Sequence, residues 1–276
     1  HGMDKVSIED RVSWVRYNLS AITNGDLAND FYAKRAALAL QEYAATGQTA
    51  VICHIDGTCN GTQWTAAMFR DAKTAKLVNV TASLLTDTPY DLYGTIAERA
   101  VKLATSKERA ALQEYMRDLT KAPIMVLGYG ASEGTIEDTI ADYLSERGNK
   151  ANPKKLAKVI NTAIKLEAPA LTRLTANLKR ILKGAPRHTV KWEAFDLTVV
   201  AENYTTEDLN LHGTSYTAKQ VGKQVPDCAA LERGISPNYI HSMDSAHLRA
   251  IINSSTVGLS CIHDSVGCPA NMVMET

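Results

Sequence analysis

Two short apolar segments that each end on an aspartate constrain this chain more than any other feature of its sequence. Residues 51–57 read VICHIDG, and residues 258–265 read GLSCIHDS. Apolar and β-branched residues bounded by turn formers predict two buried strands, which deliver Asp56 and Asp264 to their exposed ends. These aspartates are 208 residues apart in sequence, so we expect one small sheet to carry both, with the intervening chain inserted between its strands.

A pair of neighbouring carboxylates needs a counter-charge. At a separation of about 4 Å and an effective dielectric constant of about 20, the two groups repel by roughly 4 kcal/mol. A divalent cation removes this repulsion, and two oxygen-bound metal ions would suit phosphoryl transfer. Asp56 can bind metal by its carboxylate, and Gly57 leaves its backbone carbonyl reachable. Taken alone, residues 56–63 are also compatible with an ordinary strand, turn and helix.

Composition allows a large core but says little about partners. The chain has 276 residues, 45% of them hydrophobic, which is enough for one or two domains. Its 30 basic and 30 acidic residues balance, so net charge does not indicate a polyanionic partner. Residues 150–191, however, hold eleven Lys or Arg and one acidic residue. This run predicts either a solvated helix face or a groove wall that faces a phosphate backbone.

The cysteines and the hydropathy pattern suggest a reducing compartment and no membrane. The five cysteines form no CxxC pair and no Cys/His metal spacing, and two of them lie in the predicted buried strands. No segment reaches 18 apolar residues, and no signal peptide is recognisable. Neither end of the sequence resembles a natural terminus, so we expect a fragment or a partial reading frame.

Periodicity predicts an α+β chain with many helices. We expect helices over residues 6–19, 27–46, 62–71, 87–104, 107–129, 134–147, 153–183 and 237–253. Pro123 marks an expected kink or break, and Pro169 is a second candidate for a kink. A strand is expected over residues 49–55 and a hairpin over 189–203, whereas the polar segment 205–230 is expected to be loop-like.

Two helical constellations add chemistry to the aspartates. Arg117 and Lys121 are four residues apart and share a helix face, and Tyr129 lies near that face about two turns on. Two cations and a ring suit a nucleoside triphosphate, although a basic surface helix is the simpler alternative. In the helix expected to begin at Pro237, three further side chains fall near one face and could form a metal site or a polar face toward nucleic acid or the active site. They are His241, Asp244 and His247.

In their order and joint presence, these segments resemble the single-subunit DNA-dependent RNA polymerases of the bacteriophage and mitochondrial type. The matching segments are Asp56–Gln63 (motif A), Arg117–Gly130 (motif B), Ile262–Gly267 (motif C), Gly234–Arg249 (the helix before motif C) and Gly2–Val6. The resemblance covers nearly the whole chain. It implies a right-hand polymerase palm, built on a small antiparallel sheet, with a large helical fingers insertion and with both ends incomplete.

The resemblance also implies domain bounds. Residues 1–75 would be a palm segment with motif A, residues 76–187 mainly helical fingers with motif B, and residues 188–276 a palm segment with motif C. Residues 191–226 occupy the place of the promoter-reading hairpin of the resembled family, so a similar protrusion is expected there.

The resemblance assigns the catalytic and metal-binding roles residue by residue. Asp56 and Asp264 correspond to the two catalytic aspartates, with the Gly57 carbonyl as an additional ligand to two Mg²⁺ ions. Lys121 corresponds to the lysine that contacts the nucleotide phosphates and acts as a general acid toward pyrophosphate. Arg117 corresponds to its phosphate-binding companion.

The remaining nucleotide-binding assignments concern two tyrosines, a histidine and a glycine. Tyr129 corresponds to the fingers tyrosine at the template and incoming nucleotide, and Tyr93 resembles a second tyrosine near the insertion site. His241 resembles the histidine that recognises the ribose or the minor groove of the primer and template. Gly61, five residues after Asp56, would leave space beside the site.

The implied function is DNA-templated RNA synthesis by a nucleotidyltransferase. Its partners would be the DNA template, the RNA product and ribonucleoside triphosphates, without a membrane, and either further segments of the same chain or a second polypeptide. The expected location is the cytoplasm of a virus-infected bacterium, with mitochondria as the alternative.

Some positions depart from the family's usual residues. The departures are Ile52 for proline, Thr62 for an apolar residue, Ala122 for a second basic residue, Pro123 after it, and Val126 for threonine or proline. Ala122 leaves open the number of triphosphate contacts, and Pro123 the straightness of the helix. None of these departures removes a metal ligand or Lys121.

Two rival hypotheses remain open. A family A DNA polymerase shares the motif order, but such enzymes carry a bulky glutamate where this chain has Gly61, and tend to carry another where it has Ser265. Both differences favour RNA synthesis. The second rival is a catalytically inactive nucleic-acid-binding fragment, or one half of a split polymerase completed by a second chain.

Overall fold

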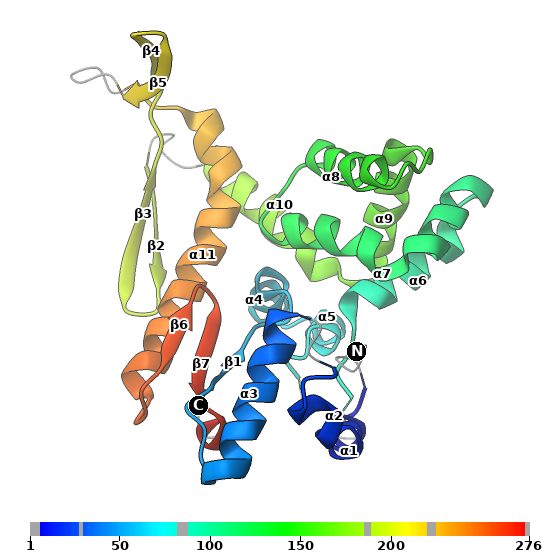
Figure 1. Cartoon of the computed structure of the whole chain (residues 1–276). Coiled ribbons are helices and arrows are strands. Elements are labelled where there is room, and N and C mark those ends of the chain that lie inside the picture. Colours follow the sequence, from blue (N-terminus) through cyan, green and yellow to red (C-terminus); the bar gives the residue numbers. More distant parts are fainter. Residues whose placement is uncertain (1–5, 28–29, 82–87, 185–188, 220–224, 274–276) are drawn as a thin grey trace. The chain divides into compact units, whose positions relative to one another are not determined.

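A computed structural model describes residues 6–27, 30–81, 88–184, 189–219 and 225–273. The chain is helix-rich with small antiparallel sheets (Figure 1), in agreement with the α+β prediction. It divides into two compact units. The smaller unit comprises residues 1–57, 81–91 and 248–276, and the larger unit comprises residues 58–80 and 92–247. The predicted division into palm and fingers segments stays a prediction.

The smaller unit joins N-terminal helices to a three-stranded antiparallel sheet. Its elements are α1 (Ile8–Tyr17), α2 (Leu19–Thr23), α3 (Phe31–Thr46), β1 (Ile52–Ile55), β6 (Ser260–Ile262), β7 (Ser265–Pro269) and the 3₁₀ helix η1 (Ala270–Met272). The strand order is β1-β7-β6, so the sheet unites segments from the two ends of the chain. Arg35 of α3 donates a hydrogen bond to the carbonyl of Ile52, at 2.9 Å, and so links the helix to β1.

The prediction that both aspartate-bearing strands are buried is wrong. β1 and β6 are the edge strands of the sheet, with Ile55 42% and Ile262 57% exposed, and the strand cysteines are half-buried (Cys53) and exposed (Cys261). The central strand is β7, whose Val266 and Cys268 are buried. Residues 265–269 were not predicted as a strand because they include a glycine and a proline, which are depleted in strands.

The larger unit is built on a helical core. Its elements are α4 (Asn60–Phe69), α5 (Ala72–Leu77), α6 (Leu92–Leu103), α7 (Ser106–Gly128), α8 (Glu133–Glu146), α9 (Pro153–Glu167), α10 (Pro169–Gly184), β2 (Thr189–Ala194), β3 (Leu197–Glu202), β4 (Thr206–Leu211), β5 (Thr214–Lys219) and α11 (Cys228–Ser254) up to residue 247. Apolar side chains from α6 to α10 form the core, among them Leu92, Ile96, Leu112, Leu119, Ile124, Ile136, Ile140, Leu156 and Ile160. This core positions the helices that carry the predicted nucleotide-binding residues.

Several helices differ from the sequence prediction at their breaks and starts, among them α6, which was predicted over 87–104 and begins at Leu92. The helix predicted over 153–183 is two helices, and the break lies at the predicted candidate kink, since Ala168, directly before Pro169, leaves helical geometry at φ −133° and ψ 65°. In α7 the non-helical residue is Met116, at φ 37° and ψ −115°, and not Pro123. The helix predicted to begin at Pro237 begins at Cys228. Burial of apolar side chains before Pro237 offsets the roughly 3 kcal/mol that a proline costs inside a helix.

Two antiparallel hairpins precede α11. The predicted hairpin over 189–203 is confirmed as β2 and β3, which lie alongside α11 (Figure 1) and pack Ala201 against Leu231 and Ile235. The segment expected to be loop-like contains a second hairpin, β4 and β5. Its turn residues, His212 and Gly213, both have positive φ, at 52° and 83°, as a type I′ turn requires. The usual asparagine or aspartate signal is absent there.

An ion cluster ties α5, α6 and α9 of the larger unit together. The buried Glu167 pairs with Lys73 at 2.8 Å and also accepts a hydrogen bond from Arg99. The hydrogen bond from Lys73, assisted by Arg99, lowers the pKa of the Glu167 carboxyl below its ordinary value of 4.5, and burial partly opposes this. The charged form of Glu167 therefore stabilises the folded state.

We expect Glu167→Gln to lower the free energy of unfolding by about 1–3 kcal/mol near pH 7. Because the folded-state pKa lies below the unfolded one, this contribution is present above about pH 4.5 and is lost as the pH falls through the folded-state pKa. Urea unfolding at pH 7 and pH 3.5 measures both effects. Glu146→Gln, in an exposed pair with Arg147, is the matched control and should change stability by less than about 0.5 kcal/mol. Equal effects of the two substitutions would contradict a stabilising role for the cluster.

Candidate active site

The sheet of the smaller unit brings the two predicted catalytic aspartates to the same end. Ile55 pairs with Val266, and the turn between β6 and β7 joins Ile262 to Ser265. Asp56 follows Ile55 directly, and Asp264 lies in that turn, immediately before Ser265. The antiparallel register therefore carries both carboxylates to the edge where β1 ends and β7 begins.

The chemistry of this edge fits a divalent metal ion. Both aspartates are exposed, and within the described ranges neither of them forms a hydrogen bond or an ion pair. The same ranges contain no cluster of three or more His, Cys, Asp or Glu that could hold a metal by itself. Mg²⁺ commonly uses one or two carboxylates and completes its shell with water and substrate phosphates. This end of the sheet therefore offers two carboxylates and the Gly57 carbonyl, which are oxygen ligands of the kind that Mg²⁺ uses.

Two residues that the sequence analysis did not assign to the site support this edge. The Ser265 hydroxyl donates a hydrogen bond to the Ile55 carbonyl at 3.3 Å and lies 3.4 Å from Nδ1 of His54. A Cβ on Gly267 would come within 2.6 Å of the Ile52 side chain and 2.7 Å of the His54 ring. The glycine thus allows the side chains of β1 to cover β7. Both residues lie within the quoted motif C segment, but a strand had not been predicted there.

In the larger unit, α7 carries the predicted phosphate-binding cations. Arg117 follows the break at Met116 and begins the part of the helix that also contains Lys121. The Arg117 guanidinium lies 5.0 Å from the ring centroid of Tyr93 on α6, a cation–π distance, and is half-buried. Lys121 is exposed and has no ion pair with any residue that the structure describes. It is therefore available to an anion from outside the chain.

Tyr93 belongs to the core of the larger unit. Its ring is 6% exposed, and its carbonyl accepts a hydrogen bond from the buried Thr120 hydroxyl at 3.0 Å. Contact between this ring and a nucleotide stays a prediction. The Tyr93 ring also contacts the Arg117 guanidinium, and this contact helps to orient the Arg117 side chain.

The structure pairs two predicted nucleotide-binding residues that lie 112 positions apart in sequence. Tyr129, at the end of α7, stacks on His241 of α11 with ring centroids 4.9 Å apart and an angle of 16° between the planes. The next residue, Gly130, has φ +86°, and a Cβ on it would lie 2.5 Å from Cβ of Ser236. Because α7 approaches α11 closely at Gly130, the neighbouring rings of Tyr129 and His241 can stack.

Gly61 packs closely against α7. Gly61 is buried, and a Cβ built on it would lie 3.0 Å from the carbonyl oxygen of Gly128. The room beside its Cα is thus filled by the backbone of α7. Packing of α4 against α7 is a sufficient reason for a glycine here, whereas a part in selecting ribonucleotides stays a prediction.

The three side chains considered as a metal site on α11 have other partners. His241 stacks on Tyr129, and Asp244 accepts a hydrogen bond from the indole Nε1 of Trp64 on α4. His247 lies edge-on to the same indole, with centroids 5.7 Å apart. The metal interpretation of this face is therefore not supported. Trp64 was not singled out from the sequence, although it directly follows the quoted motif A segment.

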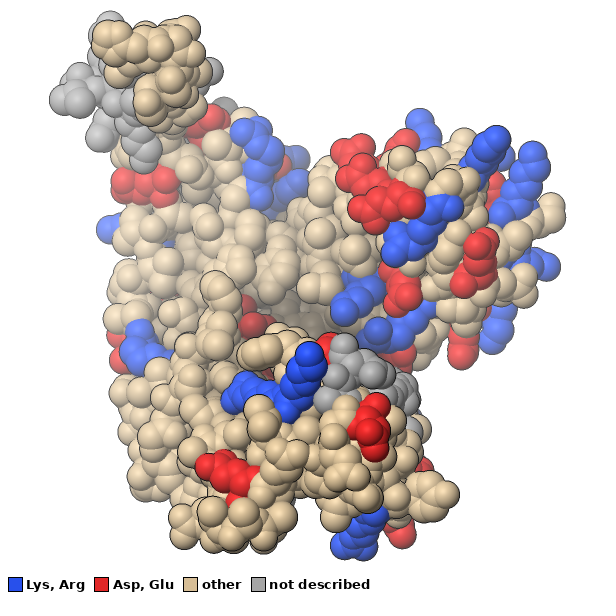
Figure 2. Space-filling view, in the orientation of Figure 1, with Lys and Arg blue, Asp and Glu red and all other residues tan. Residues whose placement is uncertain are grey.

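Most residues of the basic run lie on α9 and α10, and its lysines on α9 are exposed. Lys150 precedes α9, Lys191 lies on β2, and Arg187 lies outside the described residues. On the face drawn in Figure 2, Lys and Arg side chains in the region of α6 to α9 alternate with Asp and Glu. Separately, Lys155 of the basic run lies 3.9 Å from the buried carboxylate of Glu108. On this face the run is therefore not a uniformly positive surface.

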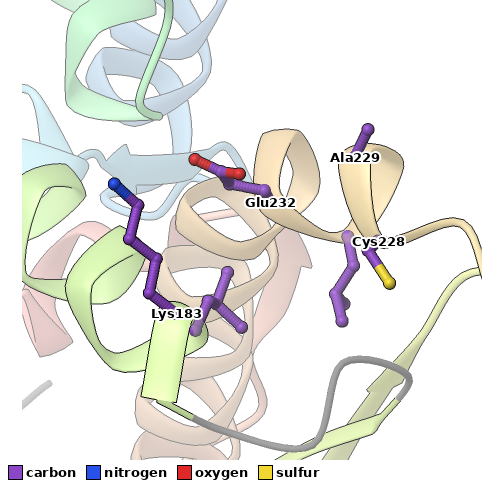
Figure 3. A pocket seen from close by; sticks show the side chains of 6 residues that line it. Lys183, Cys228, Ala229 and Glu232 are labelled. Carbon is purple, nitrogen blue, oxygen red and sulfur yellow. The ribbon is translucent and has the colours of Figure 1, made fainter.

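A separate pocket lies where α10 ends and α11 begins (Figure 3). It has a volume of about 530 Å³ and is lined by Leu182, Lys183, Cys228, Ala229, Leu231 and Glu232. The close-up shows that Lys183 and Glu232 extend from different helices. None of the predicted site residues lines this pocket.

Comparisons with known proteins place the chain among polymerases. A family model described as DNA-dependent RNA polymerase matches residues 1–185 and 154–275. The chain is 26% identical to the DNA-directed RNA polymerase of Pseudomonas phage phiKMV, with 99% of this chain and 39% of the relative covered. It is 26% identical to a probable DNA-directed RNA polymerase of Neurospora crassa (98% and 36% covered) and 23% identical to the mitochondrial DNA-directed RNA polymerase 1 of Arabidopsis thaliana (96% and 31% covered).

These relatives are much longer than the region they share with this chain, which spans between 31% and 39% of their lengths. Within the described residues, no helix has the length and apolar character needed to cross a membrane.

Proposed function

Because this chain belongs to the DNA-dependent RNA polymerase family, we propose that it carries the catalytic centre for DNA-templated RNA synthesis. The single observation that supports this most strongly is the placement of Asp56 and Asp264 at one end of one antiparallel sheet. In this proposal the sheet is the palm of a right-hand polymerase, and the helices of the larger unit belong to the fingers. The family generally uses divalent metals, and Mg²⁺ fits the carboxylate pair.

The proposed reaction joins a ribonucleotide to the 3′ end of the growing RNA. The RNA 3′-hydroxyl oxygen forms a bond to the α-phosphorus as its proton passes to solvent, the bond from this phosphorus to the bridging oxygen breaks, and pyrophosphate leaves. Asp56, Asp264 and the Gly57 carbonyl would hold two Mg²⁺ ions. When bound, these ions supply a lowered pKa for the hydroxyl and stabilise charge on the leaving group. Template base pairing selects the nucleotide, so the protein supplies position and electrostatics.

The residues of the larger unit would hold the incoming nucleotide. Arg117 and Lys121 bind its phosphates, and Lys121 donates a proton to the departing pyrophosphate. Tyr129 and His241 lie at its base and ribose, where their stacked rings offer an apolar face and a polar edge. These roles are supported by the exposure of Lys121 and by the cation–π contact that orients Arg117.

The implied partners are a DNA template, the RNA product and ribonucleoside triphosphates. The basic residues of 150–191 would border the channel for template and hybrid, and the hairpins within 191–226 would face the promoter. Further segments of the same chain or a second polypeptide would complete the enzyme. The compartment follows the relatives, either the cytoplasm of an infected bacterium or a mitochondrion.

Template-dependent incorporation of labelled nucleotides tests the proposal. The complete polypeptide that contains this chain is incubated with a primed DNA template, Mg²⁺ and either ribonucleotides or deoxyribonucleotides. We expect RNA synthesis that stops when the metal is chelated. Strong preference for deoxyribonucleotides would instead favour a family A DNA polymerase. Template binding without incorporation would favour a non-catalytic fragment.

We expect Lys121→Gln to lower kcat/KM for ribonucleotides by about 10²–10³-fold, since it removes the cation proposed to neutralise the triphosphate and to protonate pyrophosphate. Single-nucleotide extension kinetics measure this change. Lys107→Gln is the matched control, because Lys107 is also an exposed lysine of α7 and lies in its first turn. The control should retain wild-type kinetics, and an equally active Lys121→Gln variant would contradict the assigned role.

A further inference from the structure

We propose that Trp64 and Asp244 are positioning residues for the stacked pair of Tyr129 and His241. Their hydrogen bond would hold α11 against α4 so that His241 stays in register with Tyr129 at the nucleotide. The expected effect of this pair on catalysis rests on the proposed function. The tie, meaning the hydrogen bond between Trp64 and Asp244, is a contact of the structure itself.

The Trp64 indole is held by a hydrogen bond and by two ring contacts. Its Nε1 donates to the Asp244 carboxylate, and its ring lies edge-on to two others. The His247 centroid is 5.7 Å away at 89° between planes, and the Phe195 centroid, from the turn between β2 and β3, is 6.3 Å away at 81°. Edge-to-face contacts and a charge-assisted hydrogen bond together restrict this side chain to one orientation.

Within one turn, α4 contacts a neighbour of each partner of the stack, Gly128 beside Tyr129 and Asp244 near His241. Gly61 of α4 packs on the backbone of Gly128, directly before Tyr129. Trp64, three residues after Gly61, binds Asp244, which is three residues after His241 on α11. Residues three apart lie on the same side of a helix. One short helix therefore fixes the backbone beneath Tyr129 and the helix that carries His241.

The helix α11 is weakened just before His241. Pro237 lies inside the helix and has no backbone N–H to donate, so the hydrogen-bond ladder is interrupted there. The part of α11 before Pro237 is held by Leu231 and Ile235, which pack against Ala201 of the β2–β3 hairpin. The part after Pro237 depends on contacts of its own, among them those of Asp244 and His247 with Trp64 of α4.

The experiment compares Trp64→Phe, which keeps a ring but removes the donor, with Asp244→Ala and Asp244→Asn in the complete polypeptide. Loss of the bond should raise the KM for ribonucleotides about 5- to 10-fold, with kcat changed by less than about twofold. Asp244→Asn retains an acceptor oxygen and should stay within about twofold of wild type. The double variant of Trp64→Phe and Asp244→Ala should be no worse than either single one.

Trp192→Phe is the matched control. Its indole Nε1 also donates to α11, to the Ser242 hydroxyl at 2.8 Å, but Trp192 comes from β2 rather than from α4. On a primed template, where extension does not require promoter contacts, it should leave KM within about twofold of wild type. The positioning role is overturned if wild type synthesises RNA and Trp64→Phe behaves like Trp192→Phe.

The same variants separate this inference from the proposed function. If wild type shows no RNA synthesis, the proposed function fails, whereas the tie is still tested by unfolding. Non-additive effects of Trp64→Phe and Asp244→Ala on the urea midpoint would support the tie, and additive effects would overturn it.

Discussion

Replacing Asp56 or Asp264 with asparagine is expected to lower Mg²⁺-dependent RNA extension by at least about 10³-fold. Each substitution removes one negative charge from a pair of exposed carboxylates at the same sheet end, and so weakens the binding of the metal ions. Each factor of ten corresponds to about 1.4 kcal/mol of transition-state stabilisation, and metal ions contribute several kcal/mol. Rates of primer extension at saturating nucleotide measure the loss.

The control for this experiment is Asp26→Asn. Asp26 is exposed in the same unit and lies in a turn far from the strands in sequence, so its amide variant should extend RNA at the wild-type rate. Because both aspartates are at the surface, neither asparagine should alter the thermal midpoint by more than a degree or two. Near-normal extension by either Asp56→Asn or Asp264→Asn would refute the assignment of the catalytic centre.

Gly130→Ala is expected to destabilise the larger unit by about 2–5 kcal/mol and to disturb the stack between Tyr129 and His241. Two costs combine here. The φ of +86° disfavours any side chain by about 1–2 kcal/mol, and a Cβ would lie 2.5 Å from Cβ of Ser236, which adds an overpacking cost of about 1–3 kcal/mol. Urea unfolding measures the total, and the KM for nucleotides reports the displaced Tyr129.

Two further variants separate these costs. Gly148 has a similar positive φ, at +64°, but no atom lies within 4 Å of a Cβ built on it. Gly148→Ala should therefore lower the free energy of unfolding only by the cost of the backbone conformation, about 1 kcal/mol. Adding Ser236→Gly to Gly130→Ala removes the clashing Cβ and should recover the overpacking part. A double variant as unstable as Gly130→Ala alone would show that the approach of α7 to α11 is not what requires the glycine.

Much of the fold was predictable where periodicity or a strong turn signal was present. The helices over 107–129 and 134–147 and the hairpin over 189–203 correspond closely to α7, α8 and the β2–β3 pair. Failures occurred where tertiary contacts outweighed local preference. The clearest case is α11, where burial of Leu231 and Ile235 carries the helix through Pro237.

In the candidate site, too, some residues were predictable from the sequence and others were not. The segments that carry Asp56, Lys121 and Asp264 are recognisable by residue type and order, because the proposed roles of metal ligand and phosphate-binding cation require particular side chains. The packing partners are not recognisable in this way. Trp64 and Ser236 act through neighbours more than 60 residues away in sequence, and no local pattern marks such contacts.

By itself, the sequence determined that two strand-end aspartates flank a helical segment with two cations and a tyrosine, since side-chain chemistry and local periodicity are properties of short segments. Only the tertiary structure decided that β7 lies between the two strands, which brings both carboxylates to one edge of the sheet. It also decided that Gly61 contacts Gly128 and that Tyr129 stacks on His241. The physical reason is that strand order and close helix approach depend on how distant surfaces exclude water and fit together, which no single segment encodes.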